Sequence, residues 1–447
     1  MHCLTHRLLC AAHKNNELEL QMATGKRVIV VGAGPTGLIT ALGLARQGAQ
    51  VTIIDREQEI LRWPRAMVYL SSTLKVLDEL GLLEAAQKIA AWGYEYHLHF
   101  AMTGNVGRLD FRDVEDLTPY AYNLHFGQDL LAEIVLEEFL KLPGTELLWD
   151  VVFDTVLEND EQVLVSVLTA EGPRTLEADW LIGADGARSS VRKELNIEFE
   201  GFTWNEIFMA TNVVYDFDKH GYAPSTMLAN GANWAVIAKI DNNHQWRIAY
   251  AEAGELTEEE RIARIPERIK QFLPDPKQSY ELLMANSYRV HQRSASRYRQ
   301  GRVFLAGDAA HATNPIGGLG FTSGIQDANM LIKCLGGVIN GDYDEDALDW
   351  YAYERRRCFL EIANPTAIEF KRRTQETNPV KRKEDEDNFV ALMNDREMRR
   401  QAMTSIFNLS GRDYRVDWKE VYLHADEAGT SPTLGAHGGV VLSNERS

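Results

Sequence analysis

The sequence has few cysteines, no long apolar run and a deficit of basic residues. Its four cysteines, Cys3, Cys10, Cys334 and Cys358, form no close pair and no metal-ligand spacing. This pattern indicates neither a disulfide scaffold nor a zinc site, so we expect a reducing compartment and no metal. No segment reaches the roughly 18 uninterrupted apolar residues of a membrane-spanning helix. The most apolar one, residues 28–45, is broken by Gly, Pro and Thr.

Basic residues are outnumbered, with 47 Lys and Arg against 65 Asp and Glu, and the net charge is −18. Such a charge repels nucleic-acid phosphates and anionic membrane surfaces. We therefore expect a cytoplasmic protein with no nucleic-acid partner and no membrane span. The apolar stretch at residues 8–12 is too short for a signal peptide. We expect residues 1–21 to be a disordered extension, with Met22 as an alternative start.

With 447 residues, 45% of them apolar, the chain can bury one large core or two ordinary ones. Strand and helix patterns alternate from residue 26 to about residue 82, as in an α/β sheet. Residues 92–126 are rich in aromatics without a clean helical period. Residues 201–289 favour a separate, mostly antiparallel sheet with one helix at residues 257–272. These changes predict a discontinuous architecture.

The C-terminal part has a different character. Residues 346–425 show a charged, helical pattern, and residues 426–447 are rich in Gly, Ser and Thr and are expected to be mobile. The charged stretches 371–373 and 381–387 indicate a solvated helical arm that breaks at Pro379. A subunit contact made by this arm is the less favoured interpretation.

The strongest local signal is residues 28–37, where a buried strand pattern is followed by G-x-G-x-x-G and a helix. Gly32 permits the tight turn, Gly34 lets a pyrophosphate approach the backbone, and Gly37 lets helix and strand pack closely. A second strand pattern ends in Asp55, at the offset where an acid binds a ribose 2′-hydroxyl. A plain glycine turn with a surface Asp is the alternative. Because the strand, the glycines, the helix, the second strand and the acid follow one another at the expected spacing, the sequence favours dinucleotide binding.

Two later motifs indicate that the bound dinucleotide is a flavin. Asp185-Gly186 follows an apolar strand pattern within residues 181–192, and Gly307-Asp308 follows another within residues 305–311. With the glycine fingerprint, in this order and spacing, the chain resembles the class A, single-component FAD-dependent aromatic monooxygenases of the para-hydroxybenzoate hydroxylase type. The resemblance covers most of residues 26–371.

The resemblance implies an α/β fold. Its Rossmann-like FAD-binding domain, of the glutathione-reductase type, is discontinuous and is expected to comprise residues 22–91, 127–200 and 290–345. A mostly antiparallel β-sheet substrate domain is inserted as residues 92–126 and 201–289. A helical segment follows at residues 346–425. A thioredoxin-like third domain is not expected.

The resemblance also implies roles for individual residues. Asp55 is expected to bind the adenosine ribose, Gln128 to touch the flavin, and Asp308 to accept a ribityl hydroxyl. Arg65 resembles the family's mobile arginine near the pyrophosphate. The full set expected to bind FAD is Gly32, Gly34, Pro35, Thr36, Gly37, Asp55, Arg56, Arg65, Gln128, Asp185, Gly186, Gly307, Asp308, Pro315, Gly317, Gly318, Leu319 and Gly320.

Residues 315–320 would then pass beside the isoalloxazine. Reduction puts negative charge on the flavin, which backbone N–H groups at a helix N-terminus stabilise. Asp185 and Gly186 resemble a motif thought to serve both FAD and the nicotinamide donor. One departure is Gly320-Phe321-Thr322, where many relatives have Asn. The amide contact to the flavin is then lost or replaced by a hydroxyl.

The implied reaction starts when NADH or NADPH reduces FAD. The reduced flavin captures O2 as a C4a-hydroperoxide, which hydroxylates a phenolic or heteroaromatic ring. Alternatives are hydroxylation or epoxidation of a polyketide or terpenoid-linked ring, and a flavin oxidoreductase that does not oxygenate. A second G-x-G-x-x-G and a W-x-W-x-I-P segment are missing, which argues against disulfide reductases and halogenases. We expect a monomer or homodimer.

The substrate pocket is expected to draw on the antiparallel sheet. Tyr or His side chains would relay a phenolic proton, and Arg247 would face a substrate carboxylate. Each candidate has plain packing as its alternative, because strand alternation leaves open which side chains point inward. The candidates with a catalytic or pocket role are Arg65, Tyr215, His220, Tyr222, Trp234, Arg247, Tyr250 and Pro315. His311 is interpreted as structural.

Overall fold

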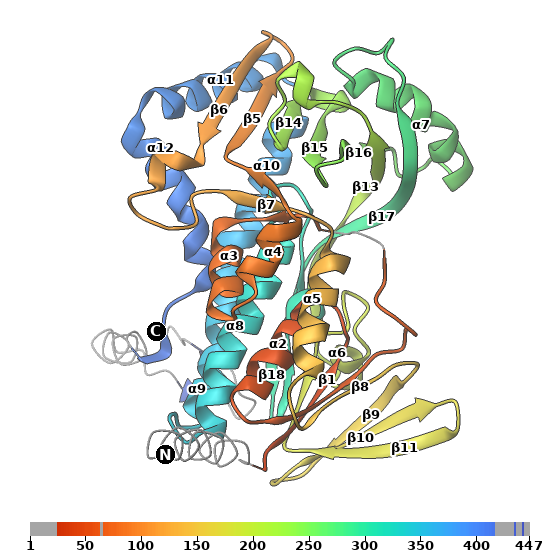
Figure 1. Ribbon diagram of the computed structural model, residues 1–447, viewed down its shortest axis with the longest axis vertical. Coiled ribbons are helices and arrows are strands. Elements are labelled where there is room, and N and C mark those ends of the chain that lie inside the picture. Colours follow the sequence, from red (N-terminus) through yellow and green to blue (C-terminus); the bar gives the residue numbers. More distant parts are fainter. Residues whose placement is uncertain (1–24, 63–65, 416–432, 435–439, 442–447) are drawn as a thin grey trace, which may run out of the picture.

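The computed structural model describes residues 25–62, 66–415, 433–434 and 440–441. The expected extension at residues 1–21, Arg65 and most of the expected tail at residues 426–447 lie outside the described residues. Figure 1 shows an elongated molecule with one sheet and its helices below and a second sheet above. The structure confirms the expected α/β fold class, while the individual domain boundaries stay a prediction.

The lower body contains a six-stranded sheet that is parallel except at its β18 edge. The central strand β1 is buried at Val28, Val30 and Val31, as expected for a parallel sheet covered on both faces. In sheet order the strands are β18 (Arg299–Gln300), β19 (Val303–Leu305), β12 (Trp180–Gly183), β1 (Arg27–Val31), β2 (Gln50–Ile54) and β8 (Thr145–Leu148).

Helices and two small sheets complete this body (Figure 1). Helix α2 packs against α5 and α8, and α8 packs against α9. The helices are α2 (Pro35–Arg46), α3 (Ser71–Glu79), α4 (Leu83–Ile89), α5 (Gln128–Leu140), α6 (Ser190–Glu194), α8 (Leu319–Ile339) and α9 (Asp346–Cys358). The small sheets are β3 (Val68–Tyr69), β7 (Asn123–His125) and β4 (Ala91–Gly93), and β11 (Gly172–Ala178), β10 (Val163–Thr169) and β9 (Val152–Glu158).

The upper sheet has eight strands and is antiparallel except where β14 pairs with β5. Its long strands β13 and β17 pair from Phe199 and Ala295 to Val214 and Glu281 and connect it to the lower body. In sheet order the strands are β20 (His311–Ala312), β17 (Glu281–Ala295), β13 (Phe199–Val214), β16 (Gln245–Glu252), β15 (Ala235–Lys239), β14 (Ser225–Ala229), β5 (Glu95–Phe100) and β6 (Asn105–Asp110).

Helix α7 (Glu258–Phe272) covers one face of the eight-stranded sheet and begins with a capping box formed by Thr257 and Glu260. Residues 92–126, which showed no regular pattern, contribute β5 and the edge strand β6. In β5 buried residues recur every third position, at His97 and Phe100, so strict alternation is lacking. The periodicity of the sequence therefore could not predict this strand.

The C-terminal arm, residues 346–410, runs from the lower body to the upper sheet. It consists of α9, a π-helical turn (Phe359–Ala363), α10 (Asn364–Gln375), α11 (Pro379–Asn394), α12 (Arg396–Thr404) and a 3-10 segment (Ser405–Ser410). The expected break at Pro379 is present, and the Asn378 side chain caps α11 by accepting the N–H of Val380 at 2.9 Å. Strands β21 (Thr433–Leu434) and β22 (Val440–Val441) pair further on.

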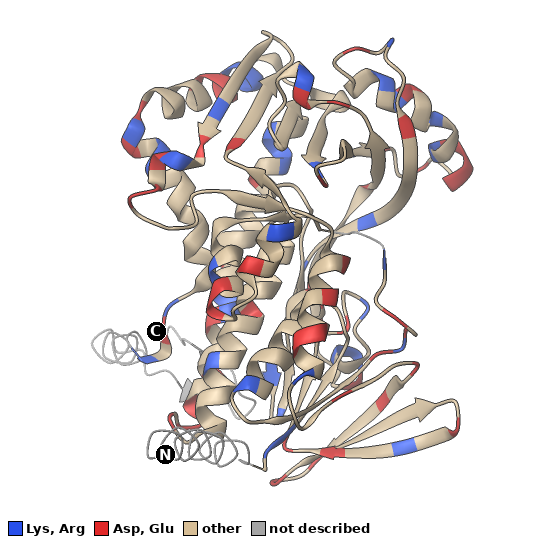
Figure 2. Cartoon of the chain, viewed as in Figure 1, with Lys and Arg blue, Asp and Glu red and all other residues tan. Residues whose placement is uncertain are grey.

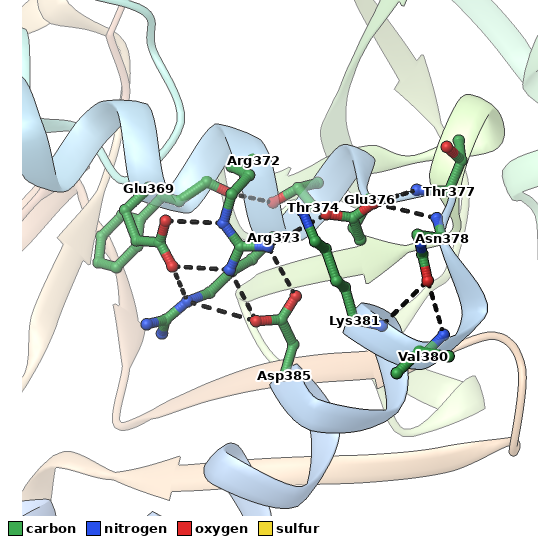
Figure 3. Close-up of polar contacts among 11 residues, drawn as sticks. Glu369, Arg372, Arg373, Thr374, Glu376, Thr377, Asn378, Val380, Lys381 and Asp385 are labelled. Atoms are coloured by element: carbon green, nitrogen blue, oxygen red, sulfur yellow. Dashed lines mark hydrogen bonds and ion pairs between the residues drawn. The ribbon is translucent and has the colours of Figure 1, made fainter.

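The expectation of a solvated arm holds only in part. Helices α10 and α11 dock on β14 and β6 and α12 docks on the turn after β6, while Lys381, Lys383 and Asp387 stay exposed. Lys371 is buried beside Glu206, and its Nζ lies 3.8 Å from the centre of the Trp204 ring. Figure 3 shows Arg372 of α10 between Glu369 and Asp385, and its Nη2 donates to Asp385 Oδ1 of α11 at 2.7 Å. Part of the charge of this stretch is therefore used in internal contacts.

The structure also shows where charged residues and apolar helices lie. Figure 2 shows acidic and basic residues interspersed over helices and loops of both halves of the molecule. Within the described part of the chain, none of the helices is long and apolar enough to span a membrane. Cys334 and Cys358 are buried free thiols.

Candidate functional site

A large cavity of about 1900 Å³ lies where the lower body, the upper sheet and the C-terminal arm meet. Pockets for one ligand are typically about 300–1,000 Å³, so this cavity has room for a large cofactor together with a second molecule. Apolar and aromatic side chains form much of its wall, as is usual for a ligand site. The predicted motifs converge on its wall.

Most of the residues expected to bind FAD line this cavity. They are Gly34, Pro35, Thr36, Asp55, Arg56, Gln128, Asp185, Gly186, Asp308, Pro315, Gly317, Gly318, Leu319 and Gly320. Gly32, Gly37 and Gly307 do not line it. Arg65 lies outside the described residues.

The three glycines of the fingerprint differ in the space around them. Two are closely packed against the backbone, and one faces open space. A Cβ on Gly32 would collide with the carbonyl of Ala184, and a Cβ on Gly37 would collide with the carbonyl of Gly32. A Cβ on Gly34 would meet no protein atom within 4 Å. Helix α2 starts there without a side-chain cap, so its N-terminal N–H groups are available to an anion in the cavity.

Asp55 braces the fingerprint turn from the end of β2. Its Oδ2 accepts the N–H of Ala33 at 2.6 Å, and its Oδ1 accepts the N–H of Glu57 at 2.9 Å. Each carboxylate oxygen can accept a further hydrogen bond, and the residue lines the cavity. Arg56 next to it forms an ion pair with Glu57, Nε to Oε1 at 3.3 Å.

Asp185 follows β12 and caps α6. Its Oδ2 accepts the N–H groups of Ser190 at 2.6 Å and Val191 at 3.3 Å. Its Oδ1 is shielded from solvent and has no hydrogen-bond partner among the described residues. Burial raises the pKa of this carboxyl above its usual range. This oxygen can therefore accept a hydrogen bond from a hydroxyl group of a bound ligand.

Asp308 projects into the cavity from the 3-10 turn Gly307–Ala309, after β19. This turn is held from behind by Asp327 of α8, a fully buried carboxylate. Asp327 Oδ2 accepts the N–H of Gly307 at 2.9 Å and lies 2.7 Å from His311 Nε2. Its Oδ1 accepts Arg355 Nε at 2.7 Å. Burial opposes the charge of Asp327, yet His311 and Arg355 hold its pKa below the usual value.

Sequence reasoning missed Asp327 and Arg355, because nothing in their local pattern distinguishes them from ordinary helix residues. His311 is buried in this cluster and does not line the cavity. Its position agrees with the structural interpretation given to it. The ion cluster therefore supports the Gly307-Asp308 motif from outside the cavity.

The loop Thr313–Gly318 enters α8 with Gly317 and Gly318 at φ of 89° and 70°, which favour glycine. Gly318 gives α8 no side-chain cap, so N–H groups at this N-terminus are open to the cavity. Thr322, the residue in the usual place of Asn, is buried and donates its hydroxyl to the Gly318 carbonyl at 2.9 Å. Its hydroxyl is therefore engaged within the helix, and Thr322 does not line the cavity.

Gln128 and Ala66 are joined by two hydrogen bonds. Gln128 Oε1 accepts the N–H of Ala66 at 3.1 Å, and the Gln128 N–H donates to the Ala66 carbonyl at 3.2 Å. Both residues line the cavity. Ala66 is thus fixed to the first turn of α5.

Only some of the pocket candidates reach the cavity. Arg247, Trp234 and Pro315 line it. Arg247 is buried, and its Nε donates to Asn212 Oδ1 of the neighbouring strand at 3.0 Å. Burial lowers the pKa of its guanidinium to about 10, so it stays charged at neutral pH.

Tyr215, His220, Tyr222 and Tyr250 do not line the cavity, which corrects the expectation for them. Tyr215 and Tyr250 are in the core beneath α7, and Tyr222 packs against that core. His220 Nε2 lies 3.2 Å from the Tyr215 hydroxyl. On β16, Arg247 faces the cavity, so Tyr250, at the opposite parity, faces α7.

The cavity wall also contains residues that the sequence did not single out. These come from β5, from the strands of the upper sheet and from the C-terminal arm, and include Tyr96, Phe208, Met227, Tyr288, Phe370, Phe389 and Met403. The aromatic density of residues 92–126 was the signal for the contribution of β5. The contribution of the arm depends on its docking, which the local sequence does not reveal.

Comparisons with known proteins agree with this geometry. Residues 26–364 match the model of a family described as FAD binding domain. The chain is 37% identical over 394 residues to para-nitrophenol 4-monooxygenase of Pseudomonas sp. strain WBC-3, which covers 88% of this chain and 98% of that protein. It is 40% identical over 370 residues to 6-hydroxy-3-succinoylpyridine 3-monooxygenase of Pseudomonas putida, with coverages of 81% and 93%.

Solved structures show the same similarity. The crystal structure of p-nitrophenol 4-monooxygenase from Pseudomonas putida DLL-E4 aligns with a TM-score of 0.84 and 36% identity, over 87% of this chain and 100% of that chain. A complex of aklavinone-11 hydroxylase with FAD and aklavinone aligns with a TM-score of 0.70 and 26% identity, over 79% of this chain and 70% of that chain.

Proposed function

The chain belongs to the class A FAD-dependent aromatic monooxygenases, and on this premise we propose that it uses NADH or NADPH and O2 to hydroxylate a phenol or a hydroxypyridine. The observation that carries the proposal is the convergence of the three predicted motifs on one cavity that also has a wall of aromatic and apolar side chains.

We propose that the residues on this wall hold FAD. The open N-terminus of α2 at Gly34 suits the pyrophosphate, and Asp55 has acceptor capacity for the adenosine ribose. Asp308 and the unpartnered Oδ1 of Asp185 are suitable acceptors for hydroxyl groups of the cofactor. Bound FAD supplies the redox chemistry and the activation of O2 that no side chain can perform.

The protein's own groups then have three tasks. N–H groups at the start of α8, around Leu319 and Gly320, would stabilise negative charge on the reduced ring. Apolar side chains such as Phe208 and Phe370 would exclude water from the reacting atoms. Arg247 would bind the anionic form of the substrate and so favour loss of its phenolic proton.

Support for the substrate class comes from the names of the two relatives. One name assigns oxygenation to carbon 4 of para-nitrophenol, and the other to carbon 3 of 6-hydroxy-3-succinoylpyridine. In both compounds that ring carbon carries a substituent and lies para to the hydroxyl. We propose the same position of attack for this enzyme. Oxygenation of a polyketide-linked ring and a non-oxygenating reaction are not favoured.

The test is a screen of para-substituted phenols and hydroxypyridines with the purified yellow protein. A true substrate should accelerate NAD(P)H oxidation in the presence of O2 and give a product with oxygen from ¹⁸O2 on the para carbon. Flavin reduction without any incorporated label, across the whole screen, would contradict the proposal. We also propose a cytoplasmic location, in line with the buried free thiols of Cys334 and Cys358.

The role of Arg247 makes a specific prediction. Because hydrogen bonds to charged groups contribute roughly 1.5–3 kcal/mol, Arg247→Met should raise KM for an anionic substrate about tenfold to a hundredfold. FAD content should be unchanged. Arg264→Met is the matched control, since Arg264 is half-exposed on α7 beside Glu252 and away from the cavity. Equal KM values for wild type and Arg247→Met would rule out the contact.

A further inference from the structure

We propose that Gln292 is a positioning residue that fixes the Thr313–Gly318 loop against the upper sheet and the C-terminal arm, and thereby sets where the flavin ring lies. The inference rests on the proposed function in one respect, namely that this loop passes beside the isoalloxazine. Gln292 is on β17, is only 3% exposed and does not line the cavity.

The amide nitrogen of Gln292 connects the loop to the arm. Its Nε2 donates to Thr313 Oγ1 at 2.6 Å and to Asn364 Oδ1 at 2.7 Å. Thr313 is at the start of the loop and lines the cavity. Asn364 is the first residue of α10 and does not line it. Both protons of the amide group are therefore used, one on each side.

The amide oxygen of Gln292 connects the loop to the neighbouring strand. Its Oε1 lies 3.2 Å from the N–H nitrogen of Asn314, 3.3 Å from Asn314 Nδ2 and 3.3 Å from Trp204 Nε1 of β13. Asn314 is fully buried and extends the network, because its Nδ2 also donates to the Ala367 carbonyl of α10 at 3.0 Å. Its Oδ1 accepts the N–H of Ile316 at 3.1 Å.

One side chain thus connects three parts of the molecule that are far apart in the sequence. The upper sheet contributes Trp204 and Gln292 itself, the loop contributes Thr313 and Asn314, and the arm contributes Asn364. Buried networks in which every polar group is paired restrict a structure to one arrangement. The loop needs such a restraint, since two consecutive glycines end it.

The position of this loop matters for the reaction. A displacement of about 1 Å of a positioned group can cost about a hundredfold in rate. Gln292 itself does not line the cavity, so its effect would be carried by Thr313 and Asn314, which do, and by Ile316, which Asn314 holds. Residues that orient a site from behind in this way are known to affect it strongly when changed.

The experiment compares Gln292→Met, Gln292→Glu and wild type, all loaded with FAD. Methionine keeps the approximate shape and removes all of the hydrogen bonds, whereas glutamate keeps the acceptor oxygen and loses the two donors. The readouts are the FAD dissociation constant, the visible absorption spectrum of the bound flavin and amide hydrogen exchange of residues 313–320. None of them needs a substrate, so they test this inference separately from the proposed reaction.

We expect Gln292→Met to weaken FAD binding about fivefold to tenfold, as for loss of a buried hydrogen bond. It should also shift the flavin spectrum and speed exchange in residues 313–320, with Gln292→Glu between it and wild type. Gln162→Met is the control, because Gln162 bonds Arg27 at the far end of the molecule.

A folded Gln292→Met protein with the wild-type spectrum, affinity and loop exchange would overturn the inference. If that variant does not fold, Asn364→Ala carries the test, since it cuts only the link to the arm. It should give a smaller shift of the same sign in spectrum and loop exchange. Wild-type values for Asn364→Ala would then overturn the inference.

Discussion

At the scale of single residues, a substitution at Gly34 can test cofactor binding without affecting folding. Its φ of −74° is accessible to any residue, and a Cβ there meets nothing in the protein. Gly34→Val should therefore fold with an unchanged melting temperature in the absence of FAD. The isopropyl group would occupy the space of the pyrophosphate, so FAD affinity should fall at least about a hundredfold. Flavin titration followed by fluorescence measures this.

Gly37→Ala is the matched comparison for that variant. Its Cβ would collide with the Gly32 carbonyl, so the turn itself must move. We expect a lower melting temperature in the absence of FAD, in contrast to Gly34→Val. Wild-type FAD affinity in Gly34→Val would show that the pyrophosphate does not approach this turn.

The same scale explains which site residues the sequence could predict. The motifs at Gly34, Asp185 and Asp308 each follow a strand, so local spacing alone brings them to one edge of the sheet. Arg247 and Tyr250 lie on one strand, and nothing in their sequence shows which of them faces the cavity. That choice depends on α7, which covers the other face.

At the scale of elements, the docking of the C-terminal arm could not be predicted from its own sequence. Pro379 correctly indicated where one helix ends, because proline acts locally. The docking depends on complementarity with β6, far away in the sequence. Glu386 of α11 accepts hydrogen bonds from Thr103 Oγ1 at 2.7 Å and Asn105 Nδ2 at 2.6 Å. A charged helix therefore appeared solvated until its partner was known.

Gly107 of β6 tests this docking. The ring of Phe389 of α11 occupies the space of a Cβ at Gly107, and it contacts Phe100 with ring centroids 5.8 Å apart. Gly107→Ala should push α11 away at a cost of about 1–3 kcal/mol, the usual range for overpacking. We expect faster cleavage of residues 376–394 in limited proteolysis.

The double variant Gly107→Ala/Phe389→Leu provides the control, because the smaller side chain makes room for the new methyl group. Its cleavage rate should be slower than the product of the two single effects predicts, as for residues in direct contact. Strict additivity, or a wild-type cleavage rate in Gly107→Ala, would contradict this docking.

At the scale of the whole molecule, the sequence predicted two units but not how they are joined. The two sheets were expected from their different residue patterns, and both are present. The joint is made by β13 and β17, by the C-terminal arm and by the small sheet around β7. His125 of β7 is fully buried there, with Nδ1 3.2 Å from the Lys239 carbonyl and Nε2 3.4 Å from Ser225 Oγ.

Burial lowers the pKa of His125 to about 4, which makes this joint sensitive to acid. The unfolded chain takes up the proton near pH 6.5, whereas the folded protein resists it until about pH 4. Between these values the unfolded state binds more protons, so the free energy of unfolding must fall as the pH falls. The loss from this one group approaches about 3 kcal/mol at pH 4.

His125→Gln should flatten that dependence. The variant loses stability at pH 7 through imperfect packing, but its free energy of unfolding should decline less than that of wild type between pH 6.5 and pH 4.5. Urea denaturation at three pH values measures the two slopes. His244→Gln is the control, because His244 is half-exposed at the surface and does not join the sheets. If His125→Gln and wild type lose stability in parallel, His125 is protonated in the folded protein as readily as in the unfolded chain. The acid sensitivity of the joint would then come from other groups.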